Sequence, residues 1–333
     1  MAAGEVTSGQ AGGYSLVLAR QRENIANLLG PEILGWLGEP DTTDVVCNPP
    51  LRGEEFGRLW VARLGRDREP VGTMARDQAM RLIGAVAASM GQEATPNTPS
   101  VEGILITDGS RFQGCIPPIV EGPFFAIRRP ASAVFSLARY VEEGKLTERQ
   151  KAVIEEAVAR RLNILIVGGT GSGKTTLLNA VILSMATITP HHRFFFIEDT
   201  PELQCAALDR TMTRTSRTMS IRDLVRVAMR SFSDRIIIGE TRGPEMLDVL
   251  TAWRTGHEGG AATIHSNIGS PVDALERVED LLLQANPNPI QRMIAKTINL
   301  IICIEVSRGH RKVTQVASVL GWDGKNYQIG AEA

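Results

Sequence analysis

A glycine-rich segment in the middle of the 333-residue chain constrains the fold more than any other feature. Residues 163–167 read Asn-Ile-Leu-Ile-Val and lead into Gly168-Gly-Thr-Gly-Ser-Gly-Lys174-Thr175. A short apolar run that ends in glycine predicts a strand buried on both faces. The spacing Gly-x4-Gly-Lys-Thr between a strand and a helix is typical of a phosphate-binding P-loop. The segment therefore predicts a nucleotide-binding α/β domain.

The chemistry of this loop explains its composition. Glycine is needed because successive backbone N–H groups must approach a phosphate closely, and several dihedrals need the freedom of glycine. The positive end of the following helix adds to the attraction. We expect Lys174 to reach the β- and γ-phosphates of ATP and the Thr175 hydroxyl to bind Mg²⁺. The residues expected to contact the nucleotide here are Gly168, Gly169, Thr170, Gly171, Ser172, Gly173, Lys174, Thr175 and Thr176.

Helical and strand patterns alternate from residue 147 onward, which implies βαβ units and a largely parallel sheet. Upstream, a helix expected over 14–29 stops at Gly30-Pro31, and another is expected over 73–90. Short strands are expected within 41–64 and at 104–106, 111–115 and 124–128. We therefore predict an α+β N-terminal domain over 1–130, a linker over 131–146, and a RecA-like P-loop ATPase domain with a predominantly parallel sheet over 147–333. In that last domain we expect helices at 148–161, 173–187, 220–232, 243–255 and 270–285, and strands at 163–167, 193–198, 235–239 and 261–265.

Acidic residues follow two of these strands. In an open α/β sheet, ligands bind beyond the carboxyl ends of the strands. Glu198-Asp199-Thr-Pro-Glu202 follows residues 193–197. These acids are placed either to hold Mg²⁺ or a water, with Glu198 as the first candidate, or to form a solvated turn.

Gly239-Glu240-Thr-Arg242 follows the apolar residues 236–238 at the end of the expected strand 235–239. Glu240 would lie close to the P-loop if the two strands are neighbours, and there it could polarise the attacking water. Alternatively, Glu240 caps the helix that begins near Pro244. Arg242 could pair with an acid or reach a phosphate.

Basic residues supply further candidates. His265 ends the strand at 261–265 and could sense the γ-phosphate, although a structural core histidine is the ordinary alternative. His257, eight residues earlier, does not give a metal-binding spacing. Arg128 and Arg129 end a strand before Pro130 and could bring N-terminal cations to the phosphates.

Composition excludes several other classes. With 36 basic and 37 acidic residues, the chain is not a polybasic nucleic-acid binder by bulk charge. Four widely spaced cysteines without a C-x-x-C pair argue against a zinc ribbon and favour a reducing cytoplasm. No signal peptide is expected at the N-terminus, and no apolar run approaches about 18–20 residues, so any membrane association is expected to be peripheral.

Four motifs in order resemble the secretion traffic ATPases of type II and type IV systems. They are the P-loop, the acidic box 198–202, Gly239-Glu240 as an atypical Walker B motif, and a histidine box over 256–265. Gly-Glu-Thr-Arg-Gly and the short N-terminal region are similar to the type IV secretion and conjugation branch. Within it, Thr-Gly-His-Glu-Gly-Gly with Thr-Ile-His-Ser-Asn most resembles the TrbB group of conjugal-transfer ATPases. Asn48-Pro49 and Pro117-Pro118 look like the N-terminal domain of the same family. The chain lacks the tetracysteine module usual in the type II branch.

The resemblance implies a homohexameric ATPase that hydrolyses ATP·Mg²⁺ to power a conjugation channel. It implies a cytoplasmic protein, peripheral on the inner face of the bacterial inner membrane, with inner-membrane channel components as partners. Catalysis would fall to Glu240, Glu198 and His265, with Arg128, Arg129 and Arg242 completing the nucleotide pocket. A pilus-assembly motor, a nucleic-acid translocase with direct DNA contact, and a nucleotide-gated scaffold are the alternatives.

Overall fold

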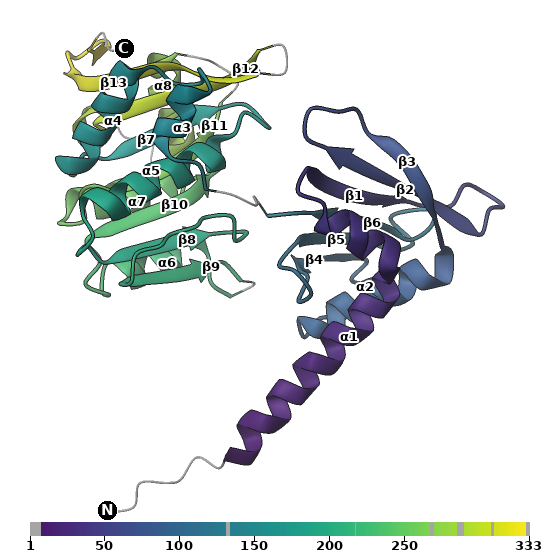
Figure 1. The fold of residues 1–333 in the computed structure, drawn as a ribbon. Coiled ribbons are helices and arrows are strands. Elements are labelled where there is room, and N and C mark those ends of the chain that lie inside the picture. Colours follow the sequence, from purple (N-terminus) through teal and green to yellow (C-terminus); the bar gives the residue numbers. More distant parts are fainter. Residues whose placement is uncertain are drawn as a thin grey trace, which may run out of the picture. The chain divides into compact units, whose positions relative to one another are not determined.

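The computed structural model describes residues 8–130, 134–216, 218–266, 270–284, 290–307 and 310–330. The chain divides into two compact units, Met1–Ser132 and Ala133–Ala333 (Figure 1). Helix α3 (Leu137–Glu142) lies in the segment that the sequence led us to expect as a linker. Because Leu137 and Tyr140 are buried in a core of unit 2, this part of the segment belongs to that unit.

Unit 1 is an antiparallel sheet with two helices. The strand order is β3-β2-β1-β6-β5-β4, and every pairing is antiparallel. Burial alternates along the strands, so one face of the sheet is packed and the other is exposed. The strands are β1 (Thr42–Asn48), β2 (Phe56–Arg63), β3 (Glu69–Ala75), β4 (Ser100–Ile104), β5 (Arg111–Cys115) and β6 (Phe124–Arg128), and the helices are α1 (Ser8–Gly38) and α2 (Arg76–Ser89).

The helices of unit 1 correct two of our expectations. Helix α1 bends at Gly30, where φ is 78°, but a second helical segment continues to Gly38 instead of stopping at Gly30-Pro31. The helix expected over 73–90 begins only at Arg76, because the residues before it pair with β2 as strand β3. Strand pairing across distant residues has overridden a helical pattern that extends into the strand.

Unit 2 is built on an eight-stranded sheet with the order β14-β13-β12-β7-β11-β10-β8-β9 (Figure 1). The pairings from β12 to β9 are parallel, and β13 and β14 add an antiparallel edge. The strands are β7 (Ile164–Gly168), β8 (Phe194–Glu198), β9 (Arg210–Arg214), β10 (Arg235–Thr241), β11 (Ala261–His265), β12 (Leu300–Ser307), β13 (His310–Trp322) and β14 (Tyr327–Ile329). We had not expected β9, β12 or the antiparallel edge.

Helices cover both faces of this sheet. One core joins the sheet to α3, α4 and α5, and the other joins it to α6, α7, α8 and α9. The result is a three-layer α/β/α unit, consistent with strands that are buried on both faces. The helices are α4 (Glu148–Ala159), α5 (Lys174–Ile188), α6 (Ile221–Ala228), α7 (Met246–Arg254), α8 (Pro271–Leu283) and α9 (Gln291–Thr297).

The helices of the described residues include no candidate that could cross a membrane. The parallel order of β7, β11, β10 and β8 brings the carboxyl ends of these strands to one edge of the sheet. This edge is where ligands bind in open α/β sheets, and it carries the loops predicted from the sequence.

Candidate nucleotide-binding site

The phosphate loop joins the end of β7 to the start of α5. Gly171 and Gly173 have φ of 71° and 92°, in the left-handed region that favours glycine. A Cβ on Gly168 would lie 2.3 Å from the carbonyl oxygen of Ile304 on β12. The loop is therefore shaped by its own backbone and by close packing against β12, and side chains at these glycines would disrupt it.

Lys174 is held inside this loop. Its side chain is buried, and Nζ donates to the carbonyl oxygens of Gly168 and Gly169, both at 2.9 Å. Burial lowers the pKa of Lys174, and the nearby charge of Glu240 opposes that shift. The Ser172 hydroxyl is buried and has no hydrogen-bond partner among the described residues. Lys174 and Ser172 thus retain hydrogen-bonding capacity that an anion in the loop would use.

The acidic box divides into a buried acid and an exposed one. Glu198, at the end of β8, is 4% exposed, and its Oε1 accepts the N–H groups of Glu202 at 2.8 Å and Leu203 at 2.7 Å. Burial raises the pKa of Glu198 to about 7, against the opposing effect of those two N–H groups. Asp199 is exposed and accepts a hydrogen bond from Thr215. The two alternatives left open by the sequence therefore describe different residues: Asp199 lies in a solvated turn, whereas Glu198 faces inward.

Glu240 lies on β10, which is separated from β7 by β11. The two strands are therefore not direct neighbours, which was the condition for placing Glu240 close to the P-loop, but the charge of Glu240 still influences Lys174. Arg242 donates through Nε to Glu240 Oε2 at 2.7 Å, so the structure pairs this arginine with an acid. Glu240 does not cap the next helix, because Glu245 is the N-cap residue of α7. The Glu245 carboxylate accepts the N–H groups of Arg242 and Gly243 in the turn before that helix.

The histidine box spans the whole length of β11, so its two histidines lie at opposite edges of the sheet. His265 ends the strand and pairs in register with Gly168 at the start of the phosphate loop. His257 precedes the strand, and its Nδ1 donates to the carbonyl oxygen of Ser233 at 2.8 Å. Only His265 is therefore placed at the candidate site.

The two N-terminal arginines are engaged within unit 1. Arg128 pairs with Asp44 at 2.7 Å, and its side chain is 63% exposed. Arg129 is half-buried and donates to the carbonyl oxygens of Glu39 and Thr42. Of the two, Arg128 has the more accessible guanidinium.

Two residues at the site were not anticipated. Asn179, buried in α5, donates to Glu202 O at 3.0 Å and accepts from the N–H of Gln204 at 2.9 Å, so it fixes the turn that contacts Glu198. A polar residue within an otherwise apolar helical segment is visible in the sequence and could have indicated Asn179. Arg311 on β13 donates through Nε to the carbonyl oxygen of Gly171 at 3.0 Å. Arg311 is 140 residues from Gly171 along the chain, so it is not part of the phosphate-loop motif and the sequence pattern does not reveal it.

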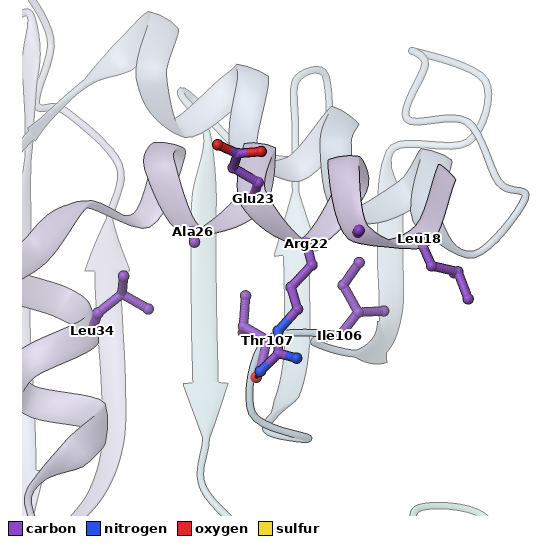
Figure 2. Close-up of a pocket in the computed structure, with 8 residues that line it drawn as sticks. Leu18, Arg22, Glu23, Ala26, Leu34, Ile106 and Thr107 are labelled. Carbon is purple, nitrogen blue, oxygen red and sulfur yellow. Dashed lines mark hydrogen bonds between the residues drawn. The ribbon is translucent and has the colours of Figure 1, made fainter. Parts of the chain in front are cut away.

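The cavity beside α1 in unit 1 suits a nucleotide less well than the phosphate loop does. An open cavity of about 810 Å³ lies beside α1 in unit 1, and Figure 2 shows Arg22 reaching from α1 toward Thr107. Arg22 Nη2 donates to Thr107 O at 2.9 Å. Arg22 and Glu23 are the charged residues of the lining, which is otherwise mainly apolar and has no glycine loop. The glycine-built loop of unit 2 is therefore the better candidate.

Comparison with known proteins agrees with this geometry. The family model described as "Type II/IV secretion system protein" matches residues 90–319. The conjugal transfer protein TrbB of Rhizobium radiobacter is 40% identical over 300 residues, which cover 90% of each chain. A probable conjugal transfer protein TrbB of Sinorhizobium fredii is 39% identical over 304 residues, 91% of each chain. The type IV secretion system protein PtlH of Bordetella pertussis is 28% identical, covering 87% of this chain and 93% of its own.

Solved structures share the fold. The pilus retraction motor PilT with bound ADP matches with a TM-score of 0.58 and 19% identity, over 90% of this chain and 80% of its own. The ATPase DotB of Legionella pneumophila matches with a TM-score of 0.57 and 16% identity, over 84% and 77%. The overall α/β fold is therefore found in other known proteins.

Proposed function

Because the chain belongs to the type II/IV secretion system protein family, we propose that it is the ATP-hydrolysing motor of a conjugation or type IV secretion machine. Similarity to conjugal transfer proteins along about nine tenths of the chain supports the choice of machine. One arrangement carries the hydrolytic role: a glycine loop with a buried lysine shares a sheet edge with carboxylates from β8 and β10. On the same grounds we assign unit 2 to the RecA-like P-loop class.

The phosphate loop supplies the binding site. Lys174 exchanges the Gly168 and Gly169 carbonyls for phosphate oxygens, and the backbone N–H groups of the loop surround the β-phosphate. Thr175, in the first turn of α5, binds Mg²⁺, with Glu198 acting through a water. The described residues include no cluster of three or more His, Cys, Asp or Glu that could hold a metal ion. The pair Thr175 and Glu198 suits Mg²⁺, because Mg²⁺ binds nucleotide phosphates through few protein ligands and keeps several waters.

Glu240 positions the attacking water and accepts its proton. Arg242 holds the Glu240 carboxylate in orientation through the Nε contact, and its charge also influences Lys174 in the phosphate loop. His265 ends the strand beside β7, where it can donate to the γ-phosphate or to the water. The buried Glu198 lies on the next strand after β10 and orders the metal's water shell.

The motor acts as a homohexamer in this proposal, peripheral on the cytoplasmic face of the inner membrane and bound to components of the channel. Closure of unit 1 over the nucleotide would bring Arg128 to the phosphates, with Arg129 in support. The exposure of Arg128 favours it over Arg129, whose guanidinium holds two backbone carbonyls of its own unit. Domain closure and release then convert hydrolysis into movement.

Phosphate release by the purified protein tests the proposal, with particle mass measured by light scattering. We expect turnover without DNA in a six-subunit particle. Lys174→Ala should lose both ADP binding and turnover. Glu240→Gln should still bind ATP while turnover falls by roughly 10³-fold, because the water loses its base. Glu245→Gln is the matched control, since the Glu245 side chain bonds only the turn before α7 among the described residues, and the change should leave turnover near the wild-type rate.

Other outcomes identify the alternatives. Turnover that requires added single-stranded DNA would indicate a nucleic-acid translocase. ATP-dependent assembly without turnover would indicate a scaffold. Near-normal turnover in Glu240→Gln would remove that residue from the reaction. Adding vesicles of inner-membrane lipid tests the peripheral membrane contact by co-sedimentation.

A further inference from the structure

Arg311 approaches the phosphate loop from the side opposite the carboxylates. It lies on β13, which pairs with β12, and β12 pairs with β7 on the edge away from β11. Its Nε donates to Gly171 O at 3.0 Å. Its Cδ lies 3.1 Å from the position that a Cβ on Gly173 would take. The side chain therefore covers the outside of the loop from Gly171 to Gly173.

The orientation of one peptide group depends on this contact. The carbonyl of Gly171 and the N–H of Ser172 belong to the same trans peptide plane and point in opposite directions. The carbonyl faces Arg311 on the outside, while the Ser172 N–H donates to Gly169 O at 3.3 Å on the inside. Rotation of this plane would change ψ of Gly171, which glycine tolerates, together with φ of Ser172. A rotated plane would place a carbonyl oxygen where phosphate oxygens must bind.

The strand that carries Arg311 is itself anchored. Val313 is buried, and its N–H donates at 2.9 Å to the carbonyl oxygen of Lys145, just after α3. Val313 also pairs with Ile304, whose carbonyl packs against Gly168. Arg311 thus extends from a fixed backbone, which limits the conformational entropy lost in making the contact.

We propose that Arg311 is a positioning residue of the nucleotide site: it holds the Gly171 carbonyl outward and so keeps the phosphate loop ready to bind. It acts through the loop backbone and takes no part in the chemistry, because Glu240 and His265 lie on strands beyond the other side of β7. The inference rests on the proposed function, since it concerns the same loop. Loss of Arg311 should weaken ATP and ADP alike and change KM far more than kcat.

Four variants separate a hydrogen bond from a charge. Arg311→Met reaches only as far as the Nε position and has no donor there, and Arg311→Lys keeps the charge but puts carbon at the Nε position. Arg311→Gln lacks the charge but carries an N–H donor the same number of bonds from the backbone as Nε. Lys312→Met, at an exposed neighbour on the same strand, is the control. The readouts are the Kd for MgADP by calorimetry, KM and kcat for ATP, and the thermal midpoint.

We expect the Met and Lys variants to raise the Kd for MgADP and the KM for ATP about tenfold, as for loss of a hydrogen bond to a charged donor. The Kd and KM of Arg311→Gln should stay within about threefold of wild type, and those of Lys312→Met should match wild type. In all variants kcat should change less than about twofold. Wild-type Kd in Arg311→Met would overturn the inference and leave the motor proposal intact. If Arg311→Lys bound MgADP with the wild-type Kd and Arg311→Gln bound it weakly, Arg311 would act through its charge and not by positioning the loop, which would overturn the inference. Absence of nucleotide binding by the wild-type chain would overturn the proposed function itself.

Discussion

The parallel strands of unit 2 begin at one side of the sheet, called here the amino edge, and end at the other, the carboxyl edge. Both edges carry polar residues, but the hydrogen bonds of those residues differ. At the amino edge, the fully buried Arg235 donates to His192 Nδ1, Gly259 O and Val158 O at 3.0, 2.7 and 2.8 Å. At the carboxyl edge, Lys174 donates to two carbonyls of its own loop and, within the described residues, to no other group, and Glu198 is buried with a raised pKa. Polar groups with many fixed partners stabilise a fold, whereas strained or exchangeable ones indicate a ligand site.

Asn163 shows how complete the bonding is at the amino edge. Its side chain donates to Thr297 O at 2.8 Å and accepts the N–H groups of Gly259 and Gly260 at 2.8 and 3.2 Å. A cavity of about 590 Å³ opens there beside Arg160, Arg254 and Lys296. These cations lie at or near the ends of α4, α7 and α9, where they offset the helix dipoles. Their charge is explained without a ligand.

The largest expected effect tests the structural role of the amino edge. Arg235→Met should leave His192 Nδ1 and two buried carbonyls without their donor, and lower the free energy of unfolding by roughly 3 kcal/mol. Urea unfolding followed by circular dichroism measures this, and MgADP affinity of the folded protein should not change. Arg254→Met, on the exposed side of α7, is the control. A loss no greater than in the control would mean that the two edges do not differ as argued.

The next effect is a pH dependence that arises from the buried acid of the carboxyl edge. The pKa of Glu198 rises from 4.5 to about 7 on folding, so between these values the native state binds more protons than the unfolded state. The free energy of unfolding should therefore fall as pH rises from about 5 to 8, by roughly 2–3 kcal/mol from this residue. Thermal midpoints at pH 5 and pH 8 measure the change.

Glu198→Gln isolates that contribution. The variant should lose this part of the pH dependence and be more stable than wild type at pH 8, while hydrolysis falls because the metal's water loses its acceptor. Asp199→Asn, at the exposed neighbour, should retain the wild-type pH dependence. Identical pH profiles for wild type and Glu198→Gln would contradict the burial argument.

The smallest effects compare two histidines that the sequence places in one motif. His265→Ala should lower kcat about tenfold at an unchanged thermal midpoint, as expected for loss of one general acid–base or donor group. His257→Ala should leave kcat unchanged and cost about 1 kcal/mol, because Ser233 O loses its hydrogen bond. The reverse result would place the functional histidine at the amino edge.

Much of unit 2 could be predicted because its signals are local. The apolar runs at β7, β8, β10 and β11 and the glycine pattern of the phosphate loop identify themselves over a few residues. Strand β9 escaped prediction because its residues are polar and largely exposed, as an edge strand tolerates. In unit 1, the helix expected over 73–90 included the last residues of β3, because only the pairing with β2 shows that they form a strand.

The candidate site was predicted unevenly for the same reason. Position after a strand marked Glu198, Glu240 and His265, and their placement at one edge follows from parallel strand order. The sequence did not reveal that β11 separates β10 from β7, nor which acid of the box is buried. Those facts depend on which distant segments pack together.

The sequence by itself determined the phosphate loop, the alternation of strands and helices, and the membership of a secretion family. Tertiary structure alone decided that Glu245 and not Glu240 is the N-cap residue of α7, that His257 and His265 lie at opposite edges, and that Arg311 contacts the phosphate loop. The physical reason is range. Periodicity and turn chemistry act between neighbours along the chain, whereas burial, strand order and hydrogen-bond partners are set by contacts between residues far apart in sequence.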